Sequence, residues 1–289
     1  MDSIIHIPSS FTSKDAGENE PRKCIPSVVQ TFEGDHLRTT ERRVGSQMKD
    51  MITSYPIERG TIKDWEAMDQ VLDNALVDSL CIDKDIAAES TILLTEPALN
   101  THKSREKLIE YMFETMNFGA VNVSNQAVLA LYGQGLLTGI VVECGEGVTQ
   151  VVPIYEGIVQ YYLIKRHGVN GNTITKYLLK LLQLHGCYSR TATDLEIVRD
   201  MKEKLCYAAC DLKVERKLAR ETTVQVEKYI LPDGTSVKIG QERFEATEVY
   251  FDPSIIDVEC KGLSDLVFDT IQECEIDCRK QFYEHILLS

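Results

Sequence analysis

The segment VVECGEGVTQVV places two glycines, Gly145 and Gly147, between two runs rich in β-branched residues. This pattern predicts a hairpin with the glycines in its turn. Glycine accepts unusual backbone dihedrals and has no side chain, so such a turn can bring backbone N–H groups against phosphate oxygens. A simple structural turn is the alternative for these two glycines taken by themselves.

A second candidate lies in EIVRDMKEKLCY, where Arg199, Lys202 and Glu203 are expected on neighbouring faces of one helical turn. Charged side chains at this spacing can contact a polar ligand. They more commonly form a solvated face with internal salt bridges, so this motif alone leaves both interpretations open.

The nine cysteines are scattered, and their odd number with no short repeated spacing argues against a disulfide framework. This usage favours a reducing compartment, the cytosol or the nucleus. Two pairs, Cys206 with Cys210 and Cys274 with Cys278, have helical spacing and could each offer two metal ligands. No paired histidines complete a tetrahedral set, so reduced thiols are the expected state.

Length and composition exclude several classes of protein. A chain of 289 residues has room for about two domains. Hydrophobic residues make up 43% and charged residues 26%, which are ordinary globular values. The formal charge of -14 argues against a nucleic-acid partner. We expect no signal peptide, because the start MDSIIHIPSS has only a two-residue apolar run, far short of the roughly 7–15 residues of a signal-peptide core. We also expect no membrane insertion, because no apolar run approaches the roughly 20 residues of a membrane span.

The hydrophobic pattern alternates between strands and helices. The first sixty residues are expected to form loops with short strands. Later features are an apolar stripe from Asp64, the strand TILLTEP, a helix capped by Ser104, a strand and helix in AVNVSNQAVLALYGQG, a helix from Thr173 to Gly186, a helix with a capping box of Thr193 and Glu196, a hairpin around Pro232-Asp233-Gly234, helices from Ser264 and Ile276, and an apolar run at 285–288. Adjacent hairpins within this alternation predict an α/β protein with mixed sheets.

The motifs VVECGEGVTQVVPIYEG and EIVRDMKEKLCY closely resemble the actin family. Further segments follow in the family's order: YPIERGTIKDWEAM, LLTEPALN, REKLIEYMFET, SNQAVLALYGQGLLTG and ILPDGTSVKIGQERFEA. The resemblance extends from about Pro21 to Ser289. Three segments are most similar to the branch of the family that starts branched filaments: LLTGIVVE, KLARETTVQVE and FYEHILLS.

This resemblance implies an actin-like ATPase (RNase H-like) fold with two related mixed-sheet domains around a nucleotide cleft. The expected domains are 1–133, with a reduced outer subdomain at about 30–57, and 134–289, with an outer subdomain at about 170–258. The expected cofactor is ATP or ADP with Mg²⁺. The chain is expected to lack the C-terminal part of the family's second domain.

The resemblance also implies roles for individual residues. The residues Gly145, Glu146, Gly147 and Val148 match the turn that binds the phosphates. Glu143 stands where actins carry an aspartate that holds the metal through water. Gln126 matches the glutamine that positions the attacking water, and Gln150 replaces the histidine of the same motif, so we expect slow hydrolysis. The residues matching those near the base and ribose are Gly171, Arg199, Lys202 and Glu203.

Two departures weaken the expected nucleotide site. The family's Gly-rich first phosphate loop is replaced by IIHIPSSFTSKDAG, in which Pro8 lacks an N–H. The Arg-Asp that follows the family's equivalent of Gly171 is Asn172-Thr173 here.

The function implied by the resemblance is a nucleotide-dependent, at most weakly hydrolysing subunit of the complex that nucleates branched actin filaments. Its expected partners are the other subunits of that complex, actin monomers and filaments, and its expected location is the cytoplasm and cytoskeleton. The alternative is a nucleotide-free interaction protein of the same fold, or a fragment. A small-molecule kinase of related architecture is a weaker alternative, because the resemblance is actin-like outside the nucleotide motifs too.

Overall fold

The computed structural model describes residues 3–6, 10–15, 23–32, 38–39, 51–82, 84–184, 186, 193–231 and 234–289. Its contacts divide the chain into two compact units. Unit 1 consists of Met1–Arg42, Asp50–Ile164 and Thr270–Ser289, and unit 2 consists of Arg43–Lys49 and Lys165–Asp269. The division into 1–133 and 134–289 lies at other positions and stays a prediction about the organisation of the chain.

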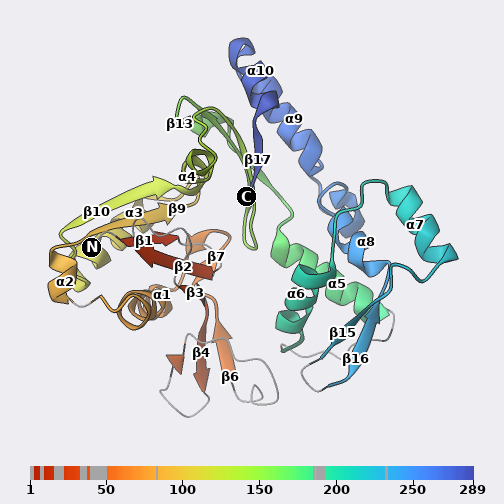
Figure 1. Ribbon diagram of the computed structural model, residues 1–289, viewed down its shortest axis with the longest axis horizontal. Helices are drawn as coiled ribbons and strands as arrows, with labels where there is room; N and C mark the ends of the chain where they lie inside the picture. The colour runs from red at the N-terminus through yellow and green to blue at the C-terminus, as the bar shows by residue number, and fades with distance from the viewer. Residues whose placement is uncertain are drawn as a thin grey trace. The chain divides into compact units, whose positions relative to one another are not determined.

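The first sheet of unit 1 has five strands in the order β10-β9-β1-β2-β3 (Figure 1). Its strands are β1 (Ser3–His6), β2 (Ser10–Asp15), β3 (Lys23–Pro26), β9 (Thr91–Glu96) and β10 (Ala120–Asn125). Strands β1, β9 and β10 are parallel, whereas β1, β2 and β3 form an antiparallel meander. The sheet is therefore mixed, as the sequence predicted.

The second sheet of unit 1 repeats this topology in the order β13-β12-β11-β17. The strands of this five-stranded sheet that belong to unit 1 are β11 (Gly139–Cys144), β12 (Thr149–Tyr155), β13 (Ile158–Val159) and β17 (Ile286–Leu288). Strands β11, β12 and β13 form an antiparallel meander, and β11 pairs in parallel with β17. In both sheets the first strand of a meander thus pairs with a parallel strand from later in the chain.

Shorter strands complete unit 1. Strands β4 (Val29–Phe32), β5 (Arg38–Thr39) and β6 (Met51–Ser54) form a three-stranded antiparallel sheet. Strands β7 (Ile57–Glu58) and β8 (Thr61–Ile62) form a two-stranded hairpin. The expectation of loops with short strands is confirmed for the described part of the first sixty residues. Residues 40–50, which belong to the predicted reduced subdomain, lie outside the described residues.

The helices of unit 1 are α1 (Trp65–Asp73) continued by a π-helical segment (Asn74–Ser79), α2 (Lys84–Ala88), α3 (His102–Glu110) continued by a second π-helical segment (Tyr111–Thr115), α4 (Gln126–Gly133), a 3₁₀ turn (Tyr161–Leu163) and α10 (Ile276–Glu284). Helices α1, α2, α3 and α4 contribute residues to two apolar clusters. The side chain of Asp64 caps α1, because Ala67 N donates to Asp64 Oδ1 at 3.1 Å. The predicted stripe is confirmed, since Met68, Val71 and Leu72 are buried.

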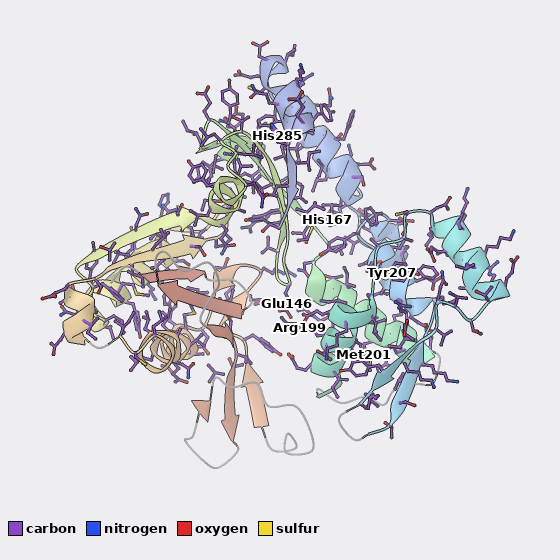
Figure 2. All side chains as sticks on the ribbon, in the orientation of Figure 1. Glu146, His167, Arg199, Met201, Tyr207 and His285 are labelled. Atoms are coloured by element: carbon purple, nitrogen blue, oxygen red, sulfur yellow. The ribbon has the colours of Figure 1, made fainter. Side chains whose placement is uncertain are left out.

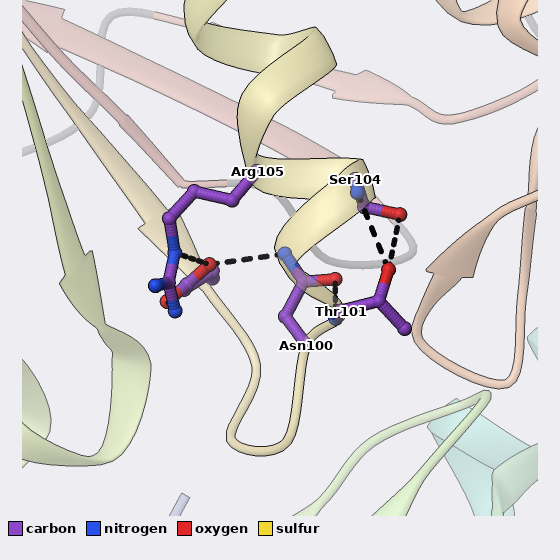
Figure 3. Close-up of polar contacts among 5 residues, drawn as sticks. Asn100, Thr101, Ser104 and Arg105 are labelled. Carbon is purple, nitrogen blue, oxygen red and sulfur yellow. Dashed lines mark hydrogen bonds and ion pairs between the residues drawn. The ribbon is translucent and has the colours of Figure 1, made fainter.

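The predicted cap of α3 is wrong. Thr101, not Ser104, is the N-cap, and its hydroxyl accepts a hydrogen bond from Ser104 N at 3.2 Å (Figure 3). Ser104 therefore lies inside the first turn and is buried. Both residues are good caps, but the Asn100 carboxamide also accepts from Thr101 N at 2.9 Å. This contact holds the chain in the conformation that precedes the helix at Thr101.

Unit 2 packs helices and a hairpin around a third cluster, which includes Leu178, Val198, Met201 and Val249. Its elements are β14 (Lys165–His167), α5 (Gly171–Leu184), α6 (Thr193–Leu205), α7 (Leu212–Glu221), β15 (Glu227–Ile230), β16 (Ser236–Ile239), α8 (Glu242–Glu248) and a 3₁₀ turn (Pro253–Ile256). Helix α9 (Leu263–Glu273) runs from unit 2 into unit 1. The sequence analysis did not anticipate α7 or α8.

The start of α5 also differs from the expectation. The helix begins at Gly171 rather than Thr173, because the Asn170 carboxamide accepts from Thr173 N at 2.9 Å and acts as the cap. Gly186 follows the helix with a φ of +72°, which supports its predicted role as the terminating residue. The side chain of Thr193 and residues 232–233 of the predicted turn lie outside the described residues.

Candidate phosphate turn and nucleotide-site residues

The predicted Gly-x-Gly hairpin is confirmed as β11–β12, with residues 145–148 as its turn. Cys144 is paired with Thr149, and Gly145 N donates to the Val148 carbonyl at 2.9 Å. A β-carbon at Gly145 would lie only 3.0 Å from that same oxygen, so any other residue there would require the Val148 carbonyl to shift. Because the Gly145 N–H already closes the turn, Gly145 serves its geometry rather than offering a donor to a ligand.

The opposite side of the turn contacts another hairpin. A methyl group at Gly147 would lie 3.6 Å from the backbone nitrogens of both Arg59 and Gly60, which connect β7 and β8. Gly60 has a φ of +73°, and a β-carbon there would approach Val148 Cγ2 to 2.8 Å. Gly60 is therefore required both by its backbone conformation and by the closeness of the two turns.

Glu143 and Gln150 are directly opposite each other on β11 and β12, just behind the turn. The Gln150 carboxamide donates from Nε2 to Glu143 Oε2. Burial raises the pKa of the Glu143 carboxyl, and the hydrogen bond from Gln150 partly opposes that rise. The Gln150 side chain is buried at 1% exposure, and its Oε1 has no hydrogen-bond partner among the residues that the structure describes. Glu143, the carboxylate expected to hold the metal through water, and Gln150, which stands in place of the family's histidine, thus form one polar pair.

These groups are compatible with a magnesium ion held through water. Mg²⁺ keeps several waters and needs few direct carboxylate ligands, so one carboxylate such as Glu143 suffices for that mode. The orphaned amide oxygen of Gln150 adds an acceptor for a water molecule in the same place. Elsewhere in the described parts of the chain, no three His, Cys, Asp or Glu side chains are grouped to hold a metal. Seven of the cysteines, including both members of the two helical pairs, are free thiols, and the expectation that they hold no metal stays a prediction.

Gln126 begins α4 at the end of β10. The Asn125 side chain caps this helix by accepting from Ala127 N at 2.9 Å. Gln126 Nε2 donates to Thr95 Oγ1 at 3.3 Å, and Thr95 is a buried residue of β9. Two adjacent parallel strands therefore fix the position of the glutamine.

The loop that follows β9 is stabilised by an ion pair that the sequence analysis missed. The buried carboxylate of Glu96 accepts from Asn100 Nδ2 at 3.0 Å and from Arg105 Nε at 3.0 Å (Figure 3). The hydrogen bond from Arg105 to Glu96 raises the pKa of the guanidinium. This contact joins the end of β9 to α3 and so supports Thr95. The only signal in the sequence was a buried-strand glutamate followed by an arginine nine residues later.

The remaining predicted residues lie in unit 2, on α5 and α6. Lys202 Nζ donates to the Gly171 carbonyl at 3.0 Å and to Thr175 Oγ1 at 3.0 Å, so the lysine joins the two helices. Arg199, labelled on α6 in Figure 2, pairs with Glu203 through Nε and Oε1 at 3.0 Å. The salt-bridge interpretation of this motif is therefore observed for Arg199 and Glu203, whereas Lys202 has a separate interhelical role.

The predicted residues thus form two groups within different compact units. Unit 1 holds the residues of the turn and its surroundings, which are Gln126, Glu143, Gly145, Glu146, Gly147, Val148 and Gln150. Glu146 lies at the tip of the β11–β12 hairpin (Figure 2). Unit 2 holds Gly171, Arg199, Lys202 and Glu203. Two contacts within these groups are the hydrogen bond from Gln150 to Glu143 in unit 1 and the ion pair of Arg199 with Glu203 in unit 2.

Comparison with known proteins identifies the class of protein. Residues 15–289 match the family described as Actin. The chain belongs to the actin family, and its mixed α/β architecture agrees with the actin-like fold that the sequence predicted.

Particular relatives carry the name actin-related protein 2. The chain is 45% identical to actin-related protein 2 of Saccharomyces cerevisiae over 289 residues, which covers 95% of this chain and 72% of the relative. It is 44% identical to the protein of that name from Arabidopsis thaliana and 43% identical to that from Acanthamoeba castellanii, with the same two coverages. Among the described residues, no helix has the length and apolar character needed to cross a membrane.

Proposed function

We propose that this chain binds ATP or ADP with Mg²⁺ and acts as the actin-related protein 2 subunit of the actin-related protein 2/3 complex. In that role it takes part in the nucleation of branched actin filaments in the cytoplasm. The observation that carries the nucleotide part is the β11–β12 hairpin, in which a glycine turn and the Glu143–Gln150 pair adjoin each other. The similarity to relatives named actin-related protein 2 supports the assembly part.

The residues of unit 1 would handle the phosphates. Backbone N–H groups of the turn that includes Glu146, Gly147 and Val148 would bind phosphate oxygens, while Gly145 preserves the turn. Glu143 would accept from a water of the metal shell, and Gln126 would orient a water for attack. The bound magnesium nucleotide would supply the phosphate group that is transferred to water.

Gln150 limits the proposed hydrolysis. A carboxamide neither gains nor loses a proton near neutral pH, so it cannot serve as a general base. Its Nε2 also donates to Glu143, which fixes the amide in the sheet. We therefore expect a weak ATPase whose main output is assembly rather than turnover.

The residues of unit 2 would bind the base and ribose. Lys202 on α6 is hydrogen-bonded to the Gly171 carbonyl on α5. Arg199 and Glu203, which form an ion pair, also lie on α6. The partners proposed with this function are the other subunits of the complex, together with actin monomers and filaments. Co-elution of the purified chain with the remaining subunits tests the assembly part directly.

A nucleotide-free interaction protein is the second candidate. One observation favours it: Lys202, Arg199 and Glu203 all have protein partners in unit 2 without any ligand. Pro8, in the connection between β1 and β2, has no N–H to donate to a phosphate, which also favours the nucleotide-free protein.

Equilibrium titration with Mg-ATP separates the two candidates. We expect micromolar binding that weakens in Lys202→Met and in Glu143→Gln. Lys204→Met is the matched control, because Lys204 lies two residues away on α6, where its ammonium pairs with Asp200 and lies over the Tyr229 ring. If a folded sample shows no binding up to millimolar ATP, the nucleotide proposal fails and the interaction protein is favoured.

A further inference from the structure

The hairpin β7–β8 is connected by a two-residue turn, Arg59–Gly60, with φ angles of 50° and 73°. Two successive residues with positive φ define the turn that best fits the twist of a two-residue hairpin. Asn-Gly and Asp-Gly are the usual residues there, because their side chains tolerate this conformation. Arginine is not among them, so the backbone provides no reason for Arg59.

The environment of Arg59 provides no structural reason either. The residue is exposed, and within the described part of the chain no carboxylate pairs with its guanidinium. Arg105, in contrast, is held by Glu96 through two contacts. An unusual residue in a strained conformation is a reason to look for a function of its side chain.

The position of the turn suggests that function. The backbone nitrogens of Arg59 and Gly60 lie 3.6 Å from where a methyl group on Gly147 would be. The backbone that carries the Arg59 side chain therefore lies against the proposed phosphate turn. Glu143 and Glu146 bring two acidic side chains to the same turn, so an incoming polyphosphate needs compensating positive charge.

We propose that Arg59 is a phosphate-binding residue, which supplies a permanent cation to the polyphosphate of the nucleotide beside the Gly145–Val148 turn. This inference rests on the proposed function and adds a residue to its phosphate site. A guanidinium presents a planar fork of donors that matches two phosphate oxygens. Arg59 thereby compensates in part for the first hairpin, where Pro8 removes a donor.

The test is Arg59→Asn, because asparagine suits a left-handed turn position and removes the charge. Wild type and variant are titrated with Mg-ATP, tripolyphosphate and adenosine, and both are melted. We expect ATP and tripolyphosphate affinities to fall about ten- to a hundredfold, as for other hydrogen bonds to charged groups. Adenosine affinity is expected to stay unchanged, and the melting temperature is expected to stay equal or rise.

Lys228→Asn is the matched control, since Lys228 is an exposed cation on β15 in unit 2 and its loss changes the net charge equally. Unchanged tripolyphosphate and ATP binding in Arg59→Asn would overturn this inference while leaving the proposed function intact. Binding of tripolyphosphate but not ATP, lost in the variant, would support Arg59 and contradict the nucleotide function. A wild type that binds neither would overturn both.

Discussion

The two large sheets of unit 1 repeat one topology but carry different chemistry in their first hairpins. Strands β1–β2 and β11–β12 are both antiparallel pairs, and both β1 and β11 pair in parallel with a later strand. The connection between β11 and β12 is Gly145–Val148, closed by its own hydrogen bond. The connection between β1 and β2 includes Pro8, within residues 7–9 that lie outside the described residues.

This difference teaches that topology and site chemistry are set by separate parts of the sequence. The apolar residues of β11 and β12, including Ile140, Val141, Val151 and Val152, are buried and determine where the strands lie. The residues of the turn between them set the local backbone geometry instead, as the close approach at Gly145 shows. One hairpin has kept glycine at its turn, and the other has a proline that offers no N–H.

The largest expected effect comes from breaking the contact of the second hairpin with the Arg59–Gly60 turn. Gly60→Ala combines a left-handed backbone with a 2.8 Å approach to Val148 Cγ2, and is expected to destabilise the fold by about 3 kcal/mol. The measurement is urea unfolding. Gly135→Ala is the matched control, because Gly135 has a φ of +72° and open space around it. If Gly60→Ala and Gly135→Ala lower the free energy of unfolding equally, the contact of Gly60 with Val148 contributes nothing to stability.

The next effect concerns the polar pair behind the second turn. Gln150→His places a titratable ring opposite Glu143, where it can accept a proton from an attacking water. We expect single-turnover phosphate release to increase about a hundredfold, the lower end of the usual contribution of a general base. Gln150→Leu is the control and should leave the slow rate unchanged. Equal rates in all three proteins would rule out a role for this position.

A smaller effect follows from the raised pKa of Glu143. Because the folded pKa lies above the unfolded value, the folded state binds more protons in the window between the two. The preference of the folded state for the protonated Glu143 carboxyl therefore stabilises the fold fully below the unfolded pKa. This stabilisation is lost as pH rises through the folded pKa. We expect Glu143→Gln to gain stability relative to wild type as pH increases from 4 to 8 in thermal melts. A constant difference across this range would contradict the argument.

The smallest effect should come from repairing the first hairpin. Pro8→Gly restores one N–H, and a single neutral hydrogen bond contributes about 0.5–1.5 kcal/mol. We expect ATP to bind about two- to tenfold more tightly, measured by the same titration as for wild type. Pro26→Gly, at the end of β3, is a control for the general effect of removing a proline. Tighter binding in the control alone would remove the distinction between the two hairpins.

Local patterns predicted much of the fold. The stripe that begins at Asp64, the strand β9 and the hairpin β11–β12 all follow from hydrophobic period and turn residues, which act over a few positions. Helix starts were less reliable. Thr101 and Ser104 are both good caps, as are Asn170 and Thr173, and the choice depends on which side chain is geometrically able to accept the N–H three residues on.

The contacts of the candidate site also divide into those that follow from local sequence and those that depend on tertiary packing. The pairing of Glu143 with Gln150 follows from the length of the hairpin turn, so the sequence contained it once the turn was placed. Support from Glu96 and Arg105 depends on a buried ion pair that no periodicity reveals. The bond from Lys202 to Gly171 depends on how α5 packs against α6.

The sequence by itself determined the family, the mixed α/β class and the glycine turn, because each depends on residue types at short, fixed spacing. Only the tertiary structure decided that Gly147 lies against Arg59 and Gly60, residues far apart in the chain. Two turns come into contact only when the strands that carry them have packed, so burial rather than local preference sets this geometry. That contact is what makes Arg59 a candidate for phosphate binding.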